Sequence, residues 1–436
     1  MERYKEYKDS GVKWLGLIPK VWEMQRWRFL LEENRQKNVS CKEKVQLQFK
    51  YGEIVRKSDQ SEELDVLETI SKYLVVLPDD IMINGLNLNY DFISQRVAQV
   101  QEKGVITSAY ISLRAKEIAN PRYYTYLLKS MDFRKLFHGM GTGIRLTLSY
   151  NELKNQFLPN PSMEEQKAIA DYLDAITTKI NEAIAQQQKM IDLLNERKQI
   201  IINNAVTKGL NPNVPMKDSG VDWIGEIPAH WSINRFRNLY KTKTGITFTK
   251  AQLTDEGQSV ISYGQIHSKD NWGASVNPIL IRHIPYFLTK NKEYALAYKG
   301  DFLFADTSED FEGCGNCVCI DRIEPIYAGY HTIIAKKNNT EYDPYLAYLF
   351  ASSKWRGQVR SKVNGVKVYS ITQSILNTCI VVLPPIQEQM NISNFITKRV
   401  NLIDAEIKRH NERIKLFQER KQIIINDVVT GKVKVS

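Results

Sequence analysis

The chain has 436 residues, of which 43% are hydrophobic and 25% are charged. Those proportions are typical of globular proteins and exclude a disordered chain or a coiled-coil rod. Lys and Arg number 60 against 49 Asp and Glu, so the net charge is +11. This excess favours a polyanionic partner such as DNA, although a soluble basic protein without such a partner has the same composition.

No apolar run approaches the ~18 residues that a membrane span needs. The N-terminus, MERYKEYKDSG, lacks the apolar core of a signal peptide. We therefore expect a cytoplasmic protein.

The chain contains an internal repeat. The segment KDSGVKWLGLIPKVW at 8–22 recurs 209 residues later as KDSGVDWIGEIPAHW at 217–231. A second motif, ERKQIIIN, occurs at 196–203 and again at 419–426. Both copies of the first motif keep their tryptophans, which we interpret as core anchors rather than as stacking platforms for bases: Trp14, Trp22, Trp223 and Trp231.

The repeat divides the chain into two globular domains, which we call heads, each followed by a helix. The first head is expected at 1–157 and its helix at 158–209. The second head is expected at 210–380 and its helix at 381–436. Little is shared between the heads outside the motifs, so we expect one architecture that presents two different surfaces.

Within each head, strand-like runs alternate with short helical patterns. Residues 73–77 and 301–304 are strand-like runs next to turn-forming residues. Residues 121–137 and 344–359 begin at a proline and carry aromatic residues at helical spacing. Each head is therefore predicted to be an α+β domain.

The two long helices carry an apolar stripe with spacings of three and four residues, as in a coiled coil. In the first helix the stripe begins with Ile169, Leu173, Ile176 and Ile180. In the second helix it begins with Ile392, Ile396, Arg399 and Ile403. A helix this apolar along one side needs a partner, and we expect the two helices to pair as an antiparallel coiled coil.

The usual enzyme motifs are missing from the sequence. It contains no GxxxxGK[ST] phosphate loop, no GxGxxG after a strand and no HExxH metal site. The segment ADTSEDFEG holds Asp306, Glu309 and Asp310, which in a metal nuclease would be ligands. We interpret it as a polar loop after a strand, so we expect no catalytic residues.

Five cysteines in a cytosolic chain are expected to be free thiols. Three of them, Cys314, Cys317 and Cys319, form the cluster CGNCVC. A structural zinc ion needs four nearby ligands, and Cys41 and Cys379 are far away in the sequence. A buried strand with small apolar cysteines is the preferred interpretation, and we expect no bound metal.

These features together resemble the specificity subunit of Type I restriction-modification systems. The resemblance rests on the duplicated opening motif, on Pro161 with Glu165-Gln166 and Pro384 with Glu388-Gln389, and on the duplicated ERKQIII. It covers essentially the whole chain. It implies two target-recognition domains that each read one half of a split DNA site, and two helices that set the spacer and dock two methyltransferase subunits.

The resemblance also implies that the chain is not itself catalytic. S-adenosylmethionine, ATP and Mg are then expected on partner subunits, which include the restriction and translocase subunits of a full complex. Double-stranded DNA is the expected ligand of this chain.

The candidate DNA-contacting residues follow from alignment of the two heads. Arg145 and Lys367 each lie two positions after an aligned glycine and are candidates for phosphate contacts. Arg134 and Arg356 are aligned cations on helices. Polar loop residues that are candidates for reading bases are Asn84, Asn87, Asn89, Thr107, Ser108, Tyr110, Thr307, Ser308, Tyr330, His331 and Lys336. Loop capping or buried polar packing is the alternative role for each of them.

Two other functions stay open on the sequence alone. A stand-alone nuclease with a site near Asp306 would cleave DNA without partners. A scaffold with heads for something other than DNA would show no sequence-selective DNA binding.

Overall fold

The computed structural model describes residues 2–50, 52–57, 64–143, 146–338, 340–365 and 367–435. The chain forms two compact units, of which the first is Met1–Gln188 with Asn411–Ser436 and the second is Lys189–His410. Each unit contains one head and one portion of each long helix. In the described ranges, no helix combines the length and the apolar character that crossing a bilayer requires.

The first head is built on a four-stranded sheet with the strand order β4-β11-β8-β9. These strands are β4 (Leu31–Glu33), β11 (Ile111–Ala115), β8 (Ile81–Ile83) and β9 (Val97–Gln99). The other strands form two-stranded pairs: β1 (Tyr7–Asp9) with β2 (Leu17–Pro19), β3 (Glu23–Arg26) with β12 (Phe157–Asn160), β5 (Leu47–Lys50) with β6 (Glu53–Arg56), and β7 (Leu74–Val76) with β10 (Gly104–Ile106). The short helices are α1 (Trp27–Leu30), α2 (Leu64–Ser71), α3 (Pro121–Phe133), η1 (Leu136–Gly139) and α4 (Tyr150–Leu153).

The second head repeats this sheet with the order β16-β24-β20-β22. Its strands are β16 (Tyr240–Thr244), β24 (Thr332–Lys337), β20 (Phe302–Ala305) and β22 (Cys317–Cys319). A second sheet has the order β18-β17-β23-β19, with β18 (Arg282–Ile284), β17 (Gln258–Ile261), β23 (Ile326–Ala328) and β19 (Leu296–Ala297). Two-stranded pairs are β13 (Met216–Asp218) with β14 (Glu226–Pro228), β15 (Ser232–Arg235) with β26 (Ile380–Leu383), and β21 (Thr307–Ser308) with β25 (Tyr369–Ser370).

The helices of the second head are also short. They are α6 (Phe236–Leu239), α7 (Tyr263–Ile266), α8 (Asp343–Ala351), α9 (Ser353–Arg360) and α10 (Gln373–Thr378), with 3₁₀ turns at η2 (Lys250–Gln252), η3 (Pro278–Leu280), η4 (Tyr286–Leu288) and η5 (Glu293–Ala295). The helix expected at 344–359 is divided in two, because Ser352 ends α8 and its side chain caps the N-terminus of α9.

The predicted duplication is confirmed by matching strand order and register in the two heads. Phe157 pairs with Arg26 between β12 and β3, and Ile380 pairs with Arg235 between β26 and β15. The expected α+β class is confirmed as well. The tryptophans of the duplicated motif are core residues: Trp22 and Trp231 are fully buried, and Trp14 and Trp223 pack against the same clusters.

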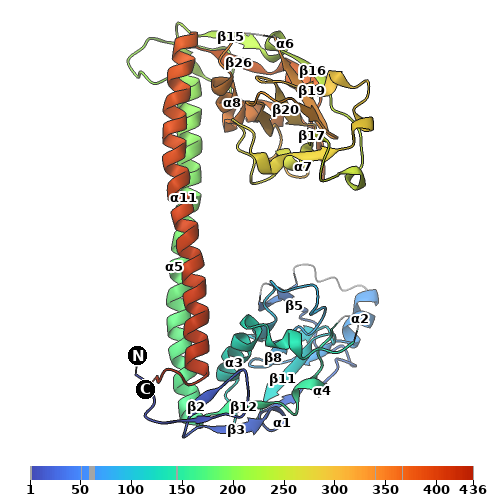
Figure 1. Cartoon of the computed structure of the whole chain (residues 1–436), viewed down its shortest axis with the longest axis vertical. Helices are drawn as coiled ribbons and strands as arrows, with labels where there is room; N and C mark the ends of the chain where they lie inside the picture. Colours follow the sequence, from blue (N-terminus) through green and yellow to red (C-terminus); the bar gives the residue numbers. More distant parts are fainter. Residues whose placement is uncertain are drawn as a thin grey trace. The chain divides into compact units, whose positions relative to one another are not determined.

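The two long helices are α5 (Met163–Lys208) and α11 (Ile386–Val429). In the first unit, Ile169 and Leu173 of α5 share a core with Val428 of α11, and Lys421 donates to Asn181. Later residues of one helix thus meet earlier residues of the other, so the pairing is antiparallel (Figure 1). In the second unit, Lys198 and Asp404 form an ion pair at 2.8 Å in the same antiparallel sense.

Two details of the helices differ from the sequence-based expectation. The helices begin later than 158 and 381, because those positions lie in β12 and β26 and belong to the heads. Arg399 is exposed rather than part of the apolar stripe, and Val400 packs against the core instead. The Arg399 guanidinium lies 5.5 Å from the Phe395 ring, which keeps the charge at the surface.

One buried amide ties each head to the start of its helix. The Gln166 side chain donates to the carbonyl oxygens of Ile118 (3.1 Å) and Pro161 (2.9 Å), and it accepts from the Asn120 backbone N–H (2.7 Å). Gln389 repeats this arrangement in the second unit, where it accepts from the Tyr342 backbone N–H at 3.0 Å. Both glutamines are completely buried.

The C-termini of the two long helices are capped in the same way in both units. Gly209 and Gly431 follow the helices with φ near +73°, a conformation that glycine adopts without strain. Tyr123 donates to the Val429 carbonyl at 3.2 Å, and Tyr345 donates to the Val206 carbonyl at 3.3 Å. Each tyrosine therefore satisfies a helix-terminal carbonyl that has no partner within its helix.

We expect Gln166→Met to lower the free energy of unfolding of the first unit by about 2–3 kcal/mol, because the Asn120 N–H loses its buried partner. Urea denaturation followed by tryptophan fluorescence measures this change. Gln186→Met is the matched control, since Gln186 is exposed on the same helix. Equal stability of the two variants would contradict the role given to the buried amide.

Candidate nucleic-acid interface

Three loops of the first head meet at one edge of its central sheet. Strand β8 ends at Ile83, which pairs with Ile111 at the start of β11, so the turn before β11 flanks Asn84. The third loop precedes α4, and its Leu148 N–H donates to the Gly85 carbonyl at 2.9 Å. These loops contain six of the predicted DNA-contacting residues: Asn84, Asn87, Asn89, Thr107, Ser108 and Tyr110.

The asparagines of the first loop have different surroundings. The Asn84 side chain accepts from the Leu86 N–H at 3.1 Å and stabilises the turn. Asn87 is exposed and has a φ of +52°, which Asn tolerates better than most residues. Asn89 is half-buried. Asn87 is therefore the asparagine whose side chain is open to a ligand.

The turn before β11 also mixes structural and exposed side chains. The Thr107 hydroxyl accepts from the Ala109 N–H at 3.3 Å, while Ser108 is exposed. The Tyr110 ring packs edge-on against Phe49, with ring centroids 5.7 Å apart. Burial raises the pKa of Tyr110, so its hydroxyl stays protonated at neutral pH and can donate a hydrogen bond.

The second head brings together the three corresponding loops. Strand β20 pairs with β24 from Phe302 to Ala305, and the Asp306 N–H donates to the His331 carbonyl at 3.1 Å. Strand β21, in the loop after β20, pairs with β25. This pairing places the loop that contains Lys367 next to the loop after β20. Thr307, Ser308, Tyr330, His331 and Lys367 therefore lie at the same edge.

Not all of these side chains face solvent. Ser308 is 2% exposed, and its hydroxyl donates to the Asp310 carbonyl at 2.7 Å, so it stabilises the loop from inside. The Tyr330 ring lies 5.0 Å from Phe248 and is half-buried. His331 is exposed with a φ of +52°, and its Nδ1 lies 3.2 Å from the Asp306 carboxylate. Lys367 is exposed.

Three other predicted cations lie away from these edges or beneath them. Arg134 ends α3 and lies 5.8 Å from the Trp14 ring. Lys336 lies near the end of β24, with its ammonium 5.8 Å from the Tyr298 ring. Arg356 points under the loop after β20 instead of into solvent. Arg145 lies outside the described residues.

Arginines beneath the loops are the main feature that the sequence did not reveal. Arg356 donates to the carbonyl oxygens of Glu312 and Cys314, and Arg360 also donates to Glu312 at 2.6 Å. Burial lowers the pKa of Arg356. In the first head, Arg96 of the loop before β9 plays this part and is 1% exposed. Arg356 was predicted as a cation on a helix but not as a support for the loop, and for Arg96 the only sequence signal was a cation just before a buried strand.

The two loops differ at their tips. The tip after β8 carries Tyr90, Phe92 and Ile93, which are all exposed. The tip after β20 carries Glu309, Asp310 and Glu312, which are acidic and exposed. Phe311 lies between them, is 46% exposed and packs edge-on against Tyr369. Equivalent loops on one scaffold thus offer a mainly apolar tip in one head and a mainly acidic tip in the other.

A family model described as Type I restriction modification DNA specificity domain matches residues 48–191 and again residues 228–416. The two matches fall on the two heads and their helices. The chain belongs to this family. Its role is the recognition of DNA targets, as the resemblance of the sequence implied.

Known proteins match this specificity subunit along nearly its whole length. The putative type I restriction enzyme MjaX specificity subunit of Methanocaldococcus jannaschii is 24% identical and covers 98% of both chains. The MjaVIII specificity subunit of the same organism is 23% identical over 98% of this chain and 97% of its own. A chain from a type I R-M system, solved to explain complex assembly and conformational transition, has a TM-score of 0.66 at 16% identity and covers 95% of this chain and 99% of its own. That structural likeness supports the fold.

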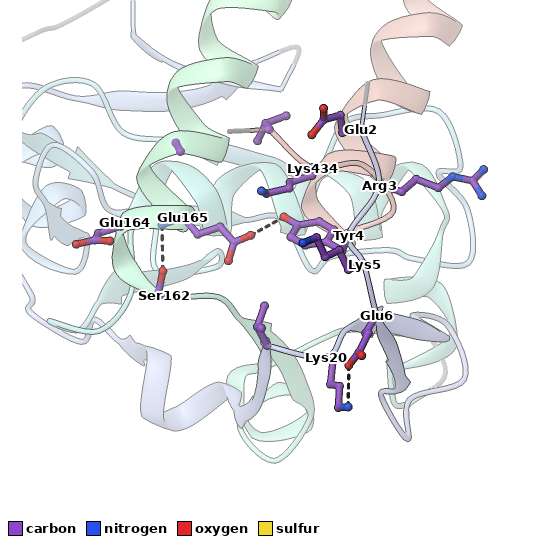
Figure 2. A pocket seen from close by; sticks show the side chains of 13 residues that line it. Glu2, Arg3, Tyr4, Lys5, Glu6, Lys20, Ser162, Glu164, Glu165 and Lys434 are labelled. Carbon is purple, nitrogen blue, oxygen red and sulfur yellow. Dashed lines mark hydrogen bonds and ion pairs between the residues drawn. The ribbon is translucent and has the colours of Figure 1, made fainter.

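The specificity subunit also has a hollow of about 690 Å³ beside the start of α5. Its walls carry both signs of charge. Glu6 and Lys20 form an ion pair at 2.7 Å, which Figure 2 marks with a dashed line. Tyr4 donates to Glu165 at 2.5 Å, and burial raises the pKa of this tyrosine. Because acidic and basic groups are mixed here, the hollow does not form a basic surface for DNA.

The cysteine cluster of the specificity subunit is part of the core. Cys317 and Cys319 lie on β22, as the preferred interpretation predicted, and Cys314 is buried just before it. Burial raises the pKa of Cys317 to about 12. In the part of the chain that the structure describes, no group of three or more His, Cys, Asp or Glu side chains is placed to hold a metal ion.

The burial of these thiols predicts how fast each one reacts. Because burial raises their pKa values, Cys314, Cys317, Cys319 and Cys379 should hold little thiolate at pH 8 and react slowly with a disulfide reagent. Cys41, which is half-buried, should be the fast thiol, and Cys41→Ser should remove the fast phase. Rapid reaction of several thiols in the folded chain would contradict the buried arrangement.

Proposed function

We propose that the two heads of this specificity subunit read the two halves of a split, asymmetric DNA site. The observation that carries the proposal is the pair of equivalent loop groups on matching sheets with different side chains at their tips. Two copies of one scaffold are expected to dock on DNA in the same way, while different tips select different bases. A half-site for each head follows.

The exposed loop residues are assigned to base and backbone contacts. Asn87 in the first head suits adenine, whose N6 and N7 atoms match a carboxamide. Lys367 in the second head neutralises a phosphate next to a loop that approaches DNA closely. The acidic tip Glu309–Glu312 of the second head suits the amino group of cytosine. The remaining candidate contacts are Asn89, Thr107, Ser108, Tyr110, Thr307, Tyr330 and His331.

Arg134, Lys336 and Arg356 are less central to this proposal. Arg134 and Lys336 lie over aromatic rings away from the loop groups, and Arg356 holds the loop after β20 from below. Ser308 likewise acts inside the loop. Their substitution is expected to change loop geometry or stability rather than a direct base contact.

The chemistry is assigned to partner subunits. Two methyltransferase subunits that carry S-adenosylmethionine would dock on the long helices. Restriction and translocase subunits with ATP and Mg would complete a restricting complex. The exposed apolar side chains Leu193 and Ile200 on α5, and Leu402 and Leu416 on α11, support docking of other chains along the helices.

The proposal is tested by co-expressing this chain with its methyltransferase subunit in a methylation-free host and mapping modified adenines by single-molecule sequencing. A split motif with a fixed spacer is the expected result. A contiguous motif, or methylation without any motif, would overturn the two-headed assignment. Absence of methylation by a verified complex would favour a scaffold, and cleavage of DNA by the chain alone would favour a nuclease.

The long helices are proposed to set the spacer between the half-sites. A four-residue insertion in one helix lengthens that helix by about 6 Å, or roughly two base-pair rises of 3.4 Å. We expect a longer spacer with both half-sites unchanged in the methylation map. Altered half-sites with the original spacer would contradict this role of the helices.

A further inference from the structure

The loop between β8 and β9 of the first head carries a group of apolar side chains in water. Ile93 is 93% exposed, Tyr90 is 76% exposed and Phe92 is 56% exposed. Three large apolar residues within four positions form a contact surface rather than scattered exposure. We call Tyr90, Phe92 and Ile93 the apolar tip.

The loop that carries the apolar tip is held from inside by one guanidinium. Arg96 Nη1 donates to the carbonyl oxygens of Asn84 (3.0 Å) and Leu86 (2.8 Å), and Nη2 donates to the carbonyl of Asp91 (2.7 Å). Its own backbone N–H donates to the Asp132 carboxylate at 2.7 Å. Three points of the loop backbone are therefore fixed to one buried side chain.

The apolar tip is held in place as well. The Asp91 carboxylate accepts from the N–H groups of Ile93 (3.1 Å) and Ser94 (2.9 Å), which forms an Asx turn. The Phe92 ring stacks on His138 at a centroid distance of 4.6 Å. His138 Nε2 in turn lies 3.1 Å from the Asp91 carbonyl oxygen. With its backbone fixed in this way, the loop keeps Ile93 in solvent.

The position of the loop indicates what covers the apolar tip. Asn87 and Ser108 lie on the same group of loops, which we assign to the first half-site. In the major groove, the only apolar group on a base edge is the C5-methyl of thymine. The corresponding tip of the second head carries the carboxylates of Glu309, Asp310 and Glu312 and one exposed ring, Phe311, so the larger apolar surface belongs to the first head.

We propose that the apolar tip packs against thymine C5-methyl groups in the major groove of the first half-site, with Arg96 as the positioning residue that holds the loop. Ile93, the most exposed member, makes the main contact. This inference rests on the proposed function, because it requires that the first head reads a half-site. It adds the chemical group that this head selects.

The test removes the methyl group alone. The assembled complex is bound to duplexes that carry the mapped site, with each thymine of the first half-site replaced in turn by uracil, which keeps the base-pairing atoms. Loss of one buried methyl group is expected to weaken binding about fourfold at the contacted position. In Ile93→Ala, the same replacement is expected to change the affinity by less than about 1.5-fold, as the contact is already lost.

Ile323→Ala is the matched control, because Ile323 is 86% exposed in the second head. This variant should keep the fourfold effect of uracil in the first half-site. The inference is overturned if the first half-site contains no thymine on either strand, if uracil binds as well as thymine at every position, or if Ile93→Ala keeps the full effect. A split motif with these outcomes leaves the proposed function standing, whereas loss of all sequence-selective binding by the wild-type complex overturns the proposed function itself.

Discussion

The buried amides of Gln166 and Gln389 are the constraint on which each unit depends. Each amide joins the start of a long helix to the segment before the main helix of a head, and both glutamine side chains are completely buried. A head that turned relative to its helix start would leave backbone groups without hydrogen bonds in the core, at a cost of about 1–3 kcal/mol each. The loops at the sheet edge are therefore presented from a fixed base.

The same duplicated architecture separates what is constant from what varies. Helix ends are closed by Gly209 with Tyr345 and by Gly431 with Tyr123, so the framework is alike in both units. The loop groups at the sheet edges use different side chains for support and for contact. Under the proposed function, specificity resides in these loop groups, on a fold that the family keeps at low sequence identity.

Much of the fold could be predicted from the sequence because the chain contains two copies of one unit. Repeated motifs located the heads, and apolar spacing located the helices and their pairing. The spacing failed at Arg399, where a residue at the expected interval turns to solvent and its neighbour Val400 packs instead. The helix starts were misplaced because β12 and β26 are short and end only two residues before the helices begin.

The candidate site was only partly predictable, for a physical reason. Polar loop residues such as Asn87 are visible in a sequence, but the direction of a side chain depends on the folded loop. Ser308 turns inward because the Asp310 carbonyl is there to accept its hydrogen bond. Arg96 is buried because three carbonyl oxygens converge on it, and no local sequence pattern predicts that convergence.

Arg96 and Arg356 donate hydrogen bonds to main-chain carbonyl oxygens, which every amino acid supplies. The support that they give to the loops above them therefore does not depend on most of the loop side chains. New tip sequences can therefore arise by mutation without loss of loop shape, which makes the recognition surface evolvable on an unchanged scaffold.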